Sequence, residues 1–320
     1  MILLDPTFIS QNCDYSFGDQ SGHQNGLCQL KEANVNNQEF LNKVNEVRKE
    51  RNWMTLFIDN IRLYKRDGIK YTAGELMNEY SRIYKDKVVS EFFSKNDLLE
   101  LCSQIEYMNF IIFTGFEDTP IDDDIFDKIP KNILSIYASN SISFGGKVIP
   151  IPYGIKRKLG HWDNSQDILF SKLNNLVEPI GLLYMSHSIT NNERIKIGEY
   201  FKDKKWVTIQ SNVNYNTFLD SIKNHKFVIC PDGNAIGCEC HRDWETLYMK
   251  RVPIVKDSEY LREIFDEFPV LFVKDFCDIT EDLLKENDYL YRESLNFDIS
   301  KLDMSILYQN CITNTLKKIN

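Results

Sequence analysis

The stretch KFVICPDGNAIGCECHRDWETLYMKRVPIVKD, residues 226–257, decides the fold of this 320-residue chain. It begins with a short run of apolar and β-branched residues, which is the pattern of a buried strand. A turn with Gly233 and Gly237 follows, then helical spacing over residues 240–249, and then a second apolar run with Pro253. A strand, a helix and another strand in this order predict an α/β chain with a parallel sheet.

Alternating strand and helix patterns continue outside this stretch. Short apolar runs such as WMTLFID (53–59), NFIIFTG (109–115) and GLLYMS (181–186) are typical of buried strands. Longer segments with helical spacing, such as NNERIKIGEYFKDK (191–204), lie between several of these runs. The first residues, MILLD (1–5), also fit a strand. The whole chain is therefore predicted to be α/β with mostly parallel sheets.

The chain is long enough for two domains. Residues 147–167 contain prolines, glycines and a polar cluster, which interrupt the strand pattern before a new unit begins near Gly181. We therefore expect an N-terminal domain over residues 1–157 and a C-terminal domain over residues 158–320. The final segment, residues 303–320, has helical spacing, and a helix there could pack back on the N-terminal domain.

The composition excludes some classes of protein. A net charge of −9 and a pI near 5.2 argue against nucleic acid as the main partner, because phosphate neutralisation needs an excess of Lys and Arg. No window approaches the roughly 18 apolar residues of a membrane-spanning helix, and the N-terminus has no basic leader. Eight cysteines are too few for a disulfide scaffold. We expect a cytoplasmic protein without a transmembrane segment, for which peripheral membrane contact stays open.

The end of the first strand in the stretch 226–257 has the features of an anion site. In a parallel sheet, ligands bind where a strand leads into a helix, and unpaired amides at the helix start attract phosphate. Arg242 and Glu245 are three residues apart, so they share a face near the first helical turn. The guanidinium suits phosphate oxygens, and the carboxylate suits the vicinal hydroxyls of a ribose. A surface ion pair, worth under about 1 kcal/mol, explains the spacing equally well.

The pattern KFVICPDGN...HRDWETLYMKRVPIV resembles the donor-binding segment of exostosin-like glycosyltransferases and related bacterial or viral polysaccharide enzymes. Arg242 and Glu245 match the R-x-x-E helix of that family, and Gly233 and Pro253 match its turn and its following strand. Lys250 departs from the pattern, because a small Gly usually ends the helix there. The resemblance implies a GT-B fold, with two Rossmann-like domains facing a central cleft. Residues 1–157 would then bind the acceptor and residues 158–320 the nucleotide sugar, which Arg242 and Glu245 would contact.

Weaker similarity to the same family extends over other segments. NFIIFTGFEDTPI (109–121) resembles a strand that ends in a polar turn with an Asp, here Asp118. LSIYASN (134–140), followed by IPIPYGI (149–155), resembles the paired strands that close the acceptor domain, with Asn140 near the cleft. The resemblance and the turn before the helix place further residues at the donor: Ser186, His187, Ser188, Arg194, Gly233, Asn234 and His241. His241 could instead be merely solvated at the start of the helix, and a packed structural role for His187 is equally open.

Sugar transfer to a hydroxyl needs a base near the acceptor and positive charge or dipoles near the leaving diphosphate. We choose Asp118 as the base, because it follows the end of a buried strand in the first half of the chain. Asp19, in a Gly-flanked loop, is the second choice, and Glu117 on the acceptor side stays open. Each of these carboxylates could instead cap a turn or a helix.

A zinc site is a competing interpretation of the same region. Cys230, Cys238, Cys240 and His241 have the side chains that bind zinc, although the C-x-C spacing is tighter than usual and no second ligand pair follows. Small apolar thiols lining a tight turn account for them better. The acidic run 122–124 fits the start of a helix rather than a D-x-D metal motif. The sequence therefore requires neither a metal nor a cofactor beyond the sugar donor.

The leading hypothesis is a metal-independent, inverting glycosyltransferase, either a hexosyl- or a pentosyltransferase. It would move a sugar from a nucleotide diphosphate, in the first place UDP, to a hydroxyl of a glycan or polysaccharide by single displacement. Inversion and UDP are implied by the resemblance alone. The alternative is a non-catalytic protein of the same fold that binds a nucleotide or a carbohydrate.

Overall fold

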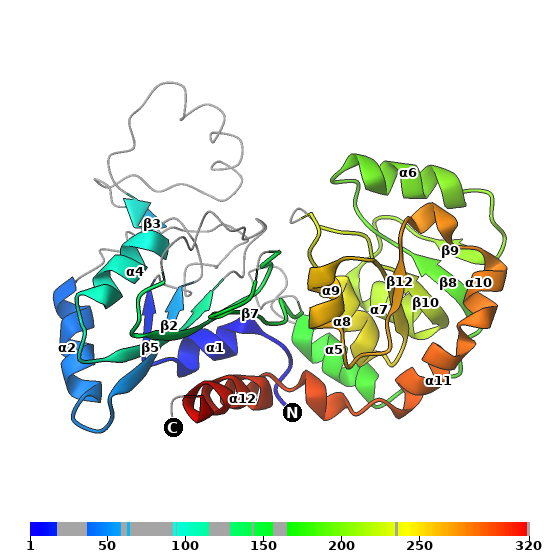
Figure 1. The fold of residues 1–320 in the computed structure, drawn as a ribbon. Helices are drawn as coiled ribbons and strands as arrows, with labels where there is room; N and C mark the ends of the chain where they lie inside the picture. The colour runs from blue at the N-terminus through cyan, green and yellow to red at the C-terminus, as the bar shows by residue number, and fades with distance from the viewer. Residues whose placement is uncertain are drawn as a thin grey trace.

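The structure is a computed structural model that describes residues 1–17, 37–58, 63–64, 92–93, 95–114, 129–142, 144–155, 165–233 and 236–318. It contains two α/β lobes, each built on a parallel sheet of five described strands (Figure 1). The first lobe takes its sheet from residues 15–150, and the second lobe takes its sheet from residues 181–273. The predicted α/β class with parallel sheets is therefore confirmed. No helix of the described residues is long and apolar enough to cross a membrane.

The strands of the first sheet lie side by side in the order in which they occur in the chain. They are β1 (Tyr15–Phe17), β2 (Trp53–Ile58), β5 (Asn109–Thr114), β6 (Ile133–Ala138) and β7 (Val148–Pro150). Helices α2 (Asn37–Val47) and α4 (Lys95–Ser103) precede β2 and β5 and cover one face. This is expected, because right-handed crossovers that all advance in one direction put their helices on the same face. A separate antiparallel pair is formed by β3 (Leu63–Tyr64) and β4 (Phe92–Phe93).

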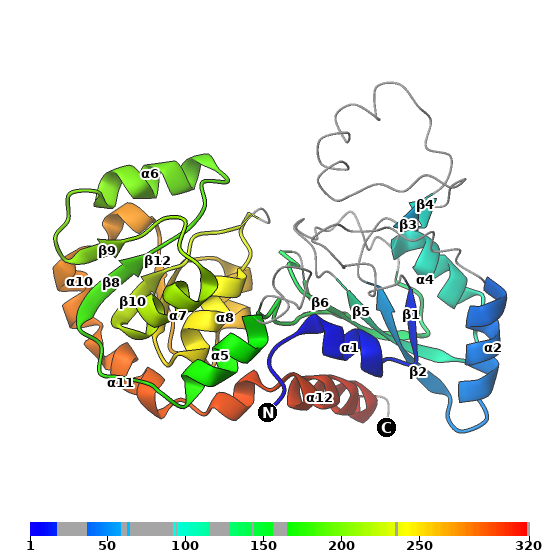
Figure 2. The ribbon, with the colours of Figure 1, turned by 180° about the vertical axis from the view of Figure 1, so that it is seen from behind.

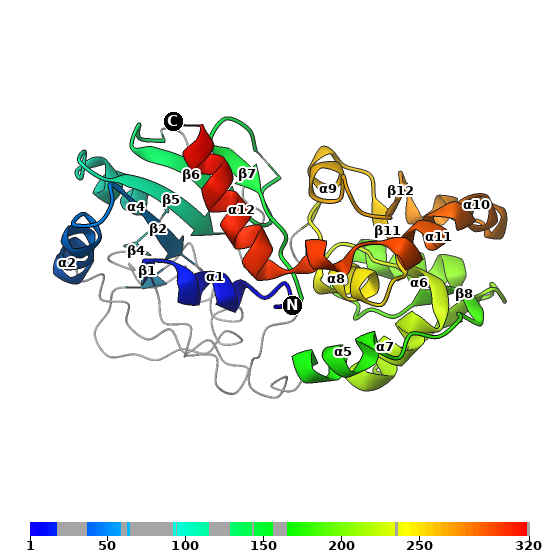
Figure 3. The same cartoon turned by 90° about the horizontal axis from the view of Figure 1, so that it is seen from below.

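The opposite face of the first sheet is covered by the two ends of the chain. Helix α1 (Pro6–Asn12) and the C-terminal helix α12 (Met304–Lys317) pack together, and α12 also contacts β6. Figures 2 and 3 show α12 leaving the second lobe and running along the first sheet beside α1. The Tyr308 ring lies 5.1 Å from the Phe113 ring, and the Tyr137 hydroxyl donates to the Cys311 carbonyl at 2.7 Å. The last helix of the chain is thus part of the core of the first lobe.

The second sheet has the strand order β12-β11-β10-β8-β9. The chain passes outward from β8 to β9, then returns across β8 to continue on the other side with β10, so the order reverses between β8 and β10. Such a reversal is the switch point of a doubly wound sheet. The strands are β8 (Gly181–Met185), β9 (Val207–Ile209), β10 (His225–Ile229), β11 (Val252–Lys256) and β12 (Leu271–Val273).

Helices cover both faces of the second sheet, as this strand order requires. Residues of α6, α10 and α11 pack on one face, and residues of α7, α8 and α9 pack on the other. The helices are α5 (Ser165–Leu173), which packs on α7, α6 (Asn192–Phe201), α7 (Tyr215–Lys223), α8 (His241–Tyr248), α9 (Glu259–Ile264), α10 (Glu281–Glu286) and α11 (Asp288–Asn296). Two short 3-10 helices are η4 (Phe276–Asp278) and η5 (Ile299–Leu302).

The two lobes share one apolar core, which contains residues of α1 and α12 as well as residues of α7, α8 and α9. Hydrogen bonds reinforce this contact. The Tyr248 hydroxyl accepts from the Leu4 amide at 2.7 Å and donates to the Leu302 carbonyl at 2.5 Å. The Tyr260 hydroxyl accepts from the Asn140 amide at 2.9 Å. Helices α8 and α9 are therefore held by groups from both lobes.

The first five residues do not form the strand that their apolar character predicts. Asp5 instead caps helix α1, because its carboxylate accepts from the Thr7 amide at 2.9 Å and Pro6 occupies the first helical turn. Proline at this position is pre-organised for a helix and has no amide that needs a partner. The Asp-Pro pair therefore outweighs the short apolar run before it.

The end of α8 keeps the tight turn although Lys250 replaces the usual glycine. Lys250 has a left-handed backbone with φ +52°. Its amide donates to the Leu247 carbonyl at 2.9 Å, and the Arg251 amide donates to the Thr246 carbonyl at 3.1 Å. These two bonds are those of a Schellman turn, in which glycine is the preferred left-handed residue. The turn thus survives with a residue that is strained there.

Candidate functional site

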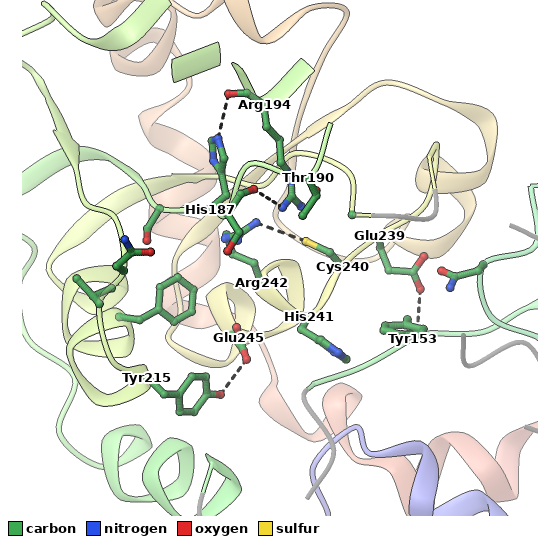
Figure 4. Close-up of a pocket in the computed structure, with 17 residues that line it drawn as sticks. Tyr153, His187, Thr190, Arg194, Tyr215, Glu239, Cys240, His241, Arg242 and Glu245 are labelled. Atoms are coloured by element: carbon green, nitrogen blue, oxygen red, sulfur yellow. Dashed lines mark hydrogen bonds between the residues drawn. The ribbon is translucent and has the colours of Figure 1, made fainter. Parts of the chain in front are cut away.

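A cavity of about 390 Å³ lies at the C-terminal ends of β8 and β10, where the strand order of the second sheet reverses (Figure 4). Its walls come from the loop after β8, the turn between β10 and α8, the start of α7, and two residues of the first lobe, Asn140 and Tyr153. Ligands of open parallel sheets bind at such switch points, and the volume is in the usual range for small-molecule sites. This cavity is therefore the candidate site.

Most of the residues singled out in the sequence line this cavity. They are Asn140, Ser186, His187, Ser188, Arg194, Gly233, His241, Arg242 and Glu245. The structure thus brings together segments that are far apart in the chain, while the binding roles of these residues remain predictions. Asp19, Glu117, Asp118 and Asn234 lie outside the described residues.

The turn that leads into α8 is shaped by local hydrogen bonds. Gly237 has φ +85°, a conformation that favours glycine, and its amide donates to the Asp232 carboxylate at 2.7 Å. The Asp243 carboxylate accepts from the Cys240 amide at 2.6 Å, which caps the helix start, and burial raises the pKa of Asp243 to about 7. One of the backbone amides at the helix start that the sequence predicted to be free for a ligand, that of Cys240, is therefore already bound to a carboxyl group of the chain. An incoming phosphate would depend on side chains more than on the Cys240 amide.

Arg242 points into the cavity, and among the described residues it forms no salt bridge, although the nearby Asp243 and Glu245 carboxylates raise its pKa. Its Nη1 lies 3.8 Å from the Cys240 sulfur, and its guanidinium carbon lies 5.9 Å from the Phe218 ring centre. Its Nε is buried and has no hydrogen-bond partner among the described residues. Glu245 is only 2% exposed and accepts a hydrogen bond from the Tyr215 hydroxyl at 2.9 Å. Glu245 is therefore buried rather than on the helix surface, and its charge still acts on Arg242.

Arg194 brings a second positive charge to the cavity, but most of its donors are engaged. It is 6% exposed, and it donates to the carbonyls of Asp232 at 2.9 Å, Ser188 at 3.0 Å and Pro231 at 3.1 Å. These bonds use three of the five guanidinium N–H groups. Arg194 therefore ties the loop after β8 to the turn after β10, and its charge reaches the cavity through a fixed side chain.

His187 is a neutral acceptor in this environment. Its Nε2 donates to the Arg194 carbonyl at 3.3 Å, so the ring proton lies on Nε2. Its Nδ1 is buried and has no hydrogen-bond partner in the described ranges. Burial, together with the positive charges of Arg242 and Arg194, lowers the pKa of His187 to about 4. At neutral pH, Nδ1 can therefore accept a hydrogen bond from a ligand hydroxyl.

His241 links the two lobes. Its Nδ1 lies 2.8 Å from the Gly154 carbonyl, and its ring packs 4.8 Å from the ring of Tyr153. Both partners belong to the segment after β7 of the first lobe. His241 is therefore not merely solvated, as one interpretation of the sequence allowed, but packs against the first lobe.

The sequence interpretation missed Glu239, which lines the cavity just before α8. Glu239 is 4% exposed, and its Oε1 accepts from the Tyr153 amide at 2.7 Å. Its Oε2 is buried without a hydrogen-bond partner in the part of the chain that the structure describes. The available signal was a carboxylate in the turn between Gly237 and the helix, but its two neighbouring cysteines drew attention to zinc. Tyr153, Tyr215 and Phe218 were missed as well, because only the fold brings them to this cavity.

The thiols of this region do not form a metal site with His241. Burial raises the pKa of Cys240 to about 12 and also raises the pKa values of Cys230 and Cys238, so all three are protonated at neutral pH. The Cys230 sulfur lies near the Thr246 hydroxyl, whereas the Cys240 thiol donates to the Asp243 carboxylate. Across the described ranges, no three His, Cys, Asp or Glu side chains are grouped so that they could hold a metal ion. The thiols serve the core and the helix cap.

Comparisons with known proteins give limited similarity. No family model matches the chain. The tetraacyldisaccharide 4'-kinase of Pelagibacter ubique (strain HTCC1062) is 24% identical over 238 residues, which are 71% of this chain and 69% of that protein. The solved structure of a mutant O-GlcNAc transferase of Thermobaculum terrenum is 8% identical with a TM-score of 0.36 and covers 83% of this chain. This chain spans 60% of that enzyme. These similarities do not assign the chain to a family.

Proposed function

We propose that this chain is a glycosyltransferase of GT-B type that uses a nucleotide diphosphate sugar, in the first place a UDP-sugar. The sugar would pass to a hydroxyl of a glycan or polysaccharide by a single, inverting displacement. One observation carries the proposal: an Arg242 guanidinium without an ion-pair partner in the described chain and the Glu245 carboxylate face one cavity at the switch point of the second sheet.

The charge of the cavity favours a diphosphate. The chain has a net charge of −9, yet Arg194 and Arg242 both line this cavity. The Arg242 Nε is buried without a hydrogen-bond partner among the described residues, and a phosphate group would satisfy it through a charge-assisted, planar pair. We assign Arg242 to the diphosphate directly, and Arg194 to the same group through its fixed charge.

The other end of the cavity suits a nucleoside. The Tyr215 hydroxyl fixes Glu245 by donating to Oε1 at 2.9 Å, which orients the carboxylate toward hydroxyl donors such as those of a ribose. The rings of Tyr215 and Phe218 line the same part of the cavity and stack with centroids 6.2 Å apart. Aromatic faces of this kind can pack against a base or a sugar ring. His187 Nδ1 offers one further acceptor.

The acceptor would approach from the first lobe. Asn140 and Tyr153 reach the cavity from that lobe, and Asn140 is buried with a left-handed backbone at φ +53°. Strained backbone of this kind gathers at functional sites. The base predicted from the sequence, Asp118, with Asp19 as second choice, stays a prediction outside the described residues.

A phosphoryl transferase is the second candidate, because the Pelagibacter protein is named as a kinase of an acylated disaccharide. The sequence contains no G-x-x-x-x-G-K-[ST] pattern, so the common phosphate loop of nucleotide-dependent kinases is not encoded. A non-catalytic binding protein is the third. These candidates differ in the nucleotide that is bound and in whether it is consumed.

A ligand panel followed by an assay of turnover distinguishes the three. We expect UDP and UDP-sugars to raise the melting temperature more than ATP does, and UDP to be released slowly from one UDP-sugar in the absence of an acceptor. Arg242→Ala should abolish both effects. Arg262→Ala is the charge-matched control, because it removes an exposed guanidinium of α9 that pairs with Asp257. It should change neither the stabilisation by UDP nor the release of UDP. Stabilisation by ATP alone would contradict the proposal, and UDP binding without turnover on any acceptor would favour a binding protein.

A further inference from the structure

Two carboxylates line the cavity among the described residues, Glu239 and Glu245. Glu245 lies beside Tyr215 in the second lobe. Glu239 lies on the side of the cavity where Tyr153 enters from the first lobe, whereas Arg242 lies nearer His187 (Figure 4). The two carboxylates therefore face different parts of any ligand that fills the cavity.

The two oxygens of Glu239 are in different situations. Oε1 is fixed by the Tyr153 amide at 2.7 Å, which holds the carboxyl group in one orientation. Oε2 is buried, and no described group makes a hydrogen bond to it. A side-chain hydrogen bond from the Tyr260 hydroxyl to the carboxyl group lowers the pKa of Glu239, against the larger effect of burial. Oε2 itself has no hydrogen-bond partner within the described residues. A buried carboxylate oxygen without a donor is costly, and a hydroxyl of a bound ligand would remove that cost.

We propose that Glu239 is the general base of the sugar transfer, a role that rests on the proposed function of the cavity. The acceptor oxygen forms a bond to the anomeric carbon of the donor sugar while the bond from that carbon to the diphosphate oxygen breaks. The electron pair of the broken bond leaves with the diphosphate, next to Arg242. The proton of the acceptor hydroxyl passes to Oε2 of Glu239, so atoms and charges balance.

The protonation behaviour of Glu239 fits this role. Burial raises its pKa to about 7, so the basic form is present at neutral pH. A base whose pKa lies near the working pH is the most effective. The titratable groups around it are Tyr260 of α9, the neighbouring Cys238 thiol and Asp243 of α8, whose own pKa is about 7. The charge of Glu239 adds a small increase to the pKa of Asp243, whose main cause is burial.

Glu239→Gln tests the proposal, because the amide keeps the size of the side chain and its oxygen can still accept from Tyr153. UDP release is followed with UDP-glucose, UDP-galactose and UDP-N-acetylglucosamine, with water as the acceptor. We expect turnover to fall by about 10²–10⁴-fold while the Kd for UDP stays unchanged. The decline of wild-type turnover below about pH 7 should disappear in the variant. Glu263→Gln, on the exposed side of α9, is the matched control and should behave as wild type.

A second measurement separates a base from a structural residue. Azide attacks the anomeric carbon without losing a proton, so it should restore UDP release in Glu239→Gln and yield a glycosyl azide. If azide restores nothing, or if the Kd for UDP rises together with the loss of turnover, Glu239 is structural and the base assignment fails. Unchanged turnover in Glu239→Gln, with loss in Asp118→Asn or Asp19→Asn, would return the role to those residues.

Failure of the proposed function has a different signature. If wild-type protein binds neither UDP nor any of the three UDP-sugars, the function itself is overturned and the base assignment falls with it. If it binds them but releases no UDP with water or any tested acceptor, the glycosyltransferase function is overturned together with the base assignment, and a binding protein remains. The base assignment alone is overturned only when the wild-type protein turns over and Glu239→Gln does so equally well.

Discussion

The two sheets of this protein are both parallel, yet they differ in how their strands are ordered. In the first lobe the described strands follow one another across the sheet in chain order, and in the second lobe the order reverses between β8 and β10. The cavity with Arg194 and Arg242 lies at that reversal. The first sheet has no such point among its described strands, and its second face is closed by α1 and α12 instead. Topology, rather than composition, therefore decides which lobe holds the charged site.

The lobes also differ in what they bring to the cavity. The second lobe contributes both guanidinium groups and both carboxylates, whereas the described part of the first lobe contributes Asn140 and Tyr153. Charge is thus concentrated where a diphosphate would bind, and the first lobe supplies neutral groups where an acceptor would enter. Substitutions made in one lobe at a time test this difference.

The largest expected effect is a loss of stability of the first lobe in the variant Tyr308→Ala. This side chain of α12 packs 5.1 Å from the Phe113 ring, and its hydroxyl donates to the Asn12 carbonyl at 2.9 Å. Its loss should lower the free energy of unfolding by about 3–5 kcal/mol, because a large buried ring leaves a cavity. Denaturant unfolding measures this, and Tyr289→Ala, at a side chain that is 51% exposed, is the control. If both variants lose the same stability, α12 does not close the first sheet.

Next in size is the effect of Glu245→Ala on the second lobe. Removing a carboxylate that binds ribose hydroxyls should weaken UDP binding by about 10–100-fold, the worth of hydrogen bonds to a charged group. Tyr215→Phe keeps the carboxylate but removes the hydroxyl that fixes it, so its effect should be smaller. Titration calorimetry with UDP measures both variants. Equal binding in wild type and Glu245→Ala would remove this residue from the donor site.

The pH dependence of stability should show the environment of His187. Its pKa is about 4 in the folded chain against an ordinary value of 6.5, so the unfolded chain takes up the proton first as the pH falls. Its contribution to stability is therefore complete above pH 6.5 and is lost as the pH falls to 4. Relative to His187→Gln, wild type should lose stability over this window in denaturant titrations at several pH values. Asp243 and Glu239, whose pKa values are raised, act in the opposite direction in both proteins and cancel in the difference.

The smallest expected effect is a gain of stability in the variant Lys250→Gly, at the end of α8. Glycine adopts φ +52° without strain, so the variant should gain up to about 1 kcal/mol of unfolding free energy. The lost hydrogen bond from Lys250 Nζ to the Leu295 carbonyl, at 2.8 Å, reduces the gain. Lys274→Gly, at a residue without a positive φ, is a matched control that should not stabilise. A loss of stability in Lys250→Gly would show that the side chain, not the backbone, matters there.

Local pattern predicted the elements of the second lobe well and the site only in part. The strand, turn and helix of residues 226–257 follow from short apolar runs, Gly237 and helical spacing, all of which are local. Strand order is not local, so the reversal between β8 and β10 could not be obtained from periodicity. The orientation of the Glu239 carboxylate depends on a hydrogen bond from Tyr153, 86 residues away, and its raised pKa depends on burial that only the packed lobes create. Strand β1 has three residues and gives almost no periodic signal.

The most direct test of the central claim is a crystal structure of the protein with UDP bound. The account predicts the diphosphate within hydrogen-bond distance of the Arg242 guanidinium, and the ribose hydroxyls on Glu245, in the cavity between the ends of β8 and β10. UDP bound elsewhere, or Arg242 turned away from a diphosphate in this cavity, would contradict it.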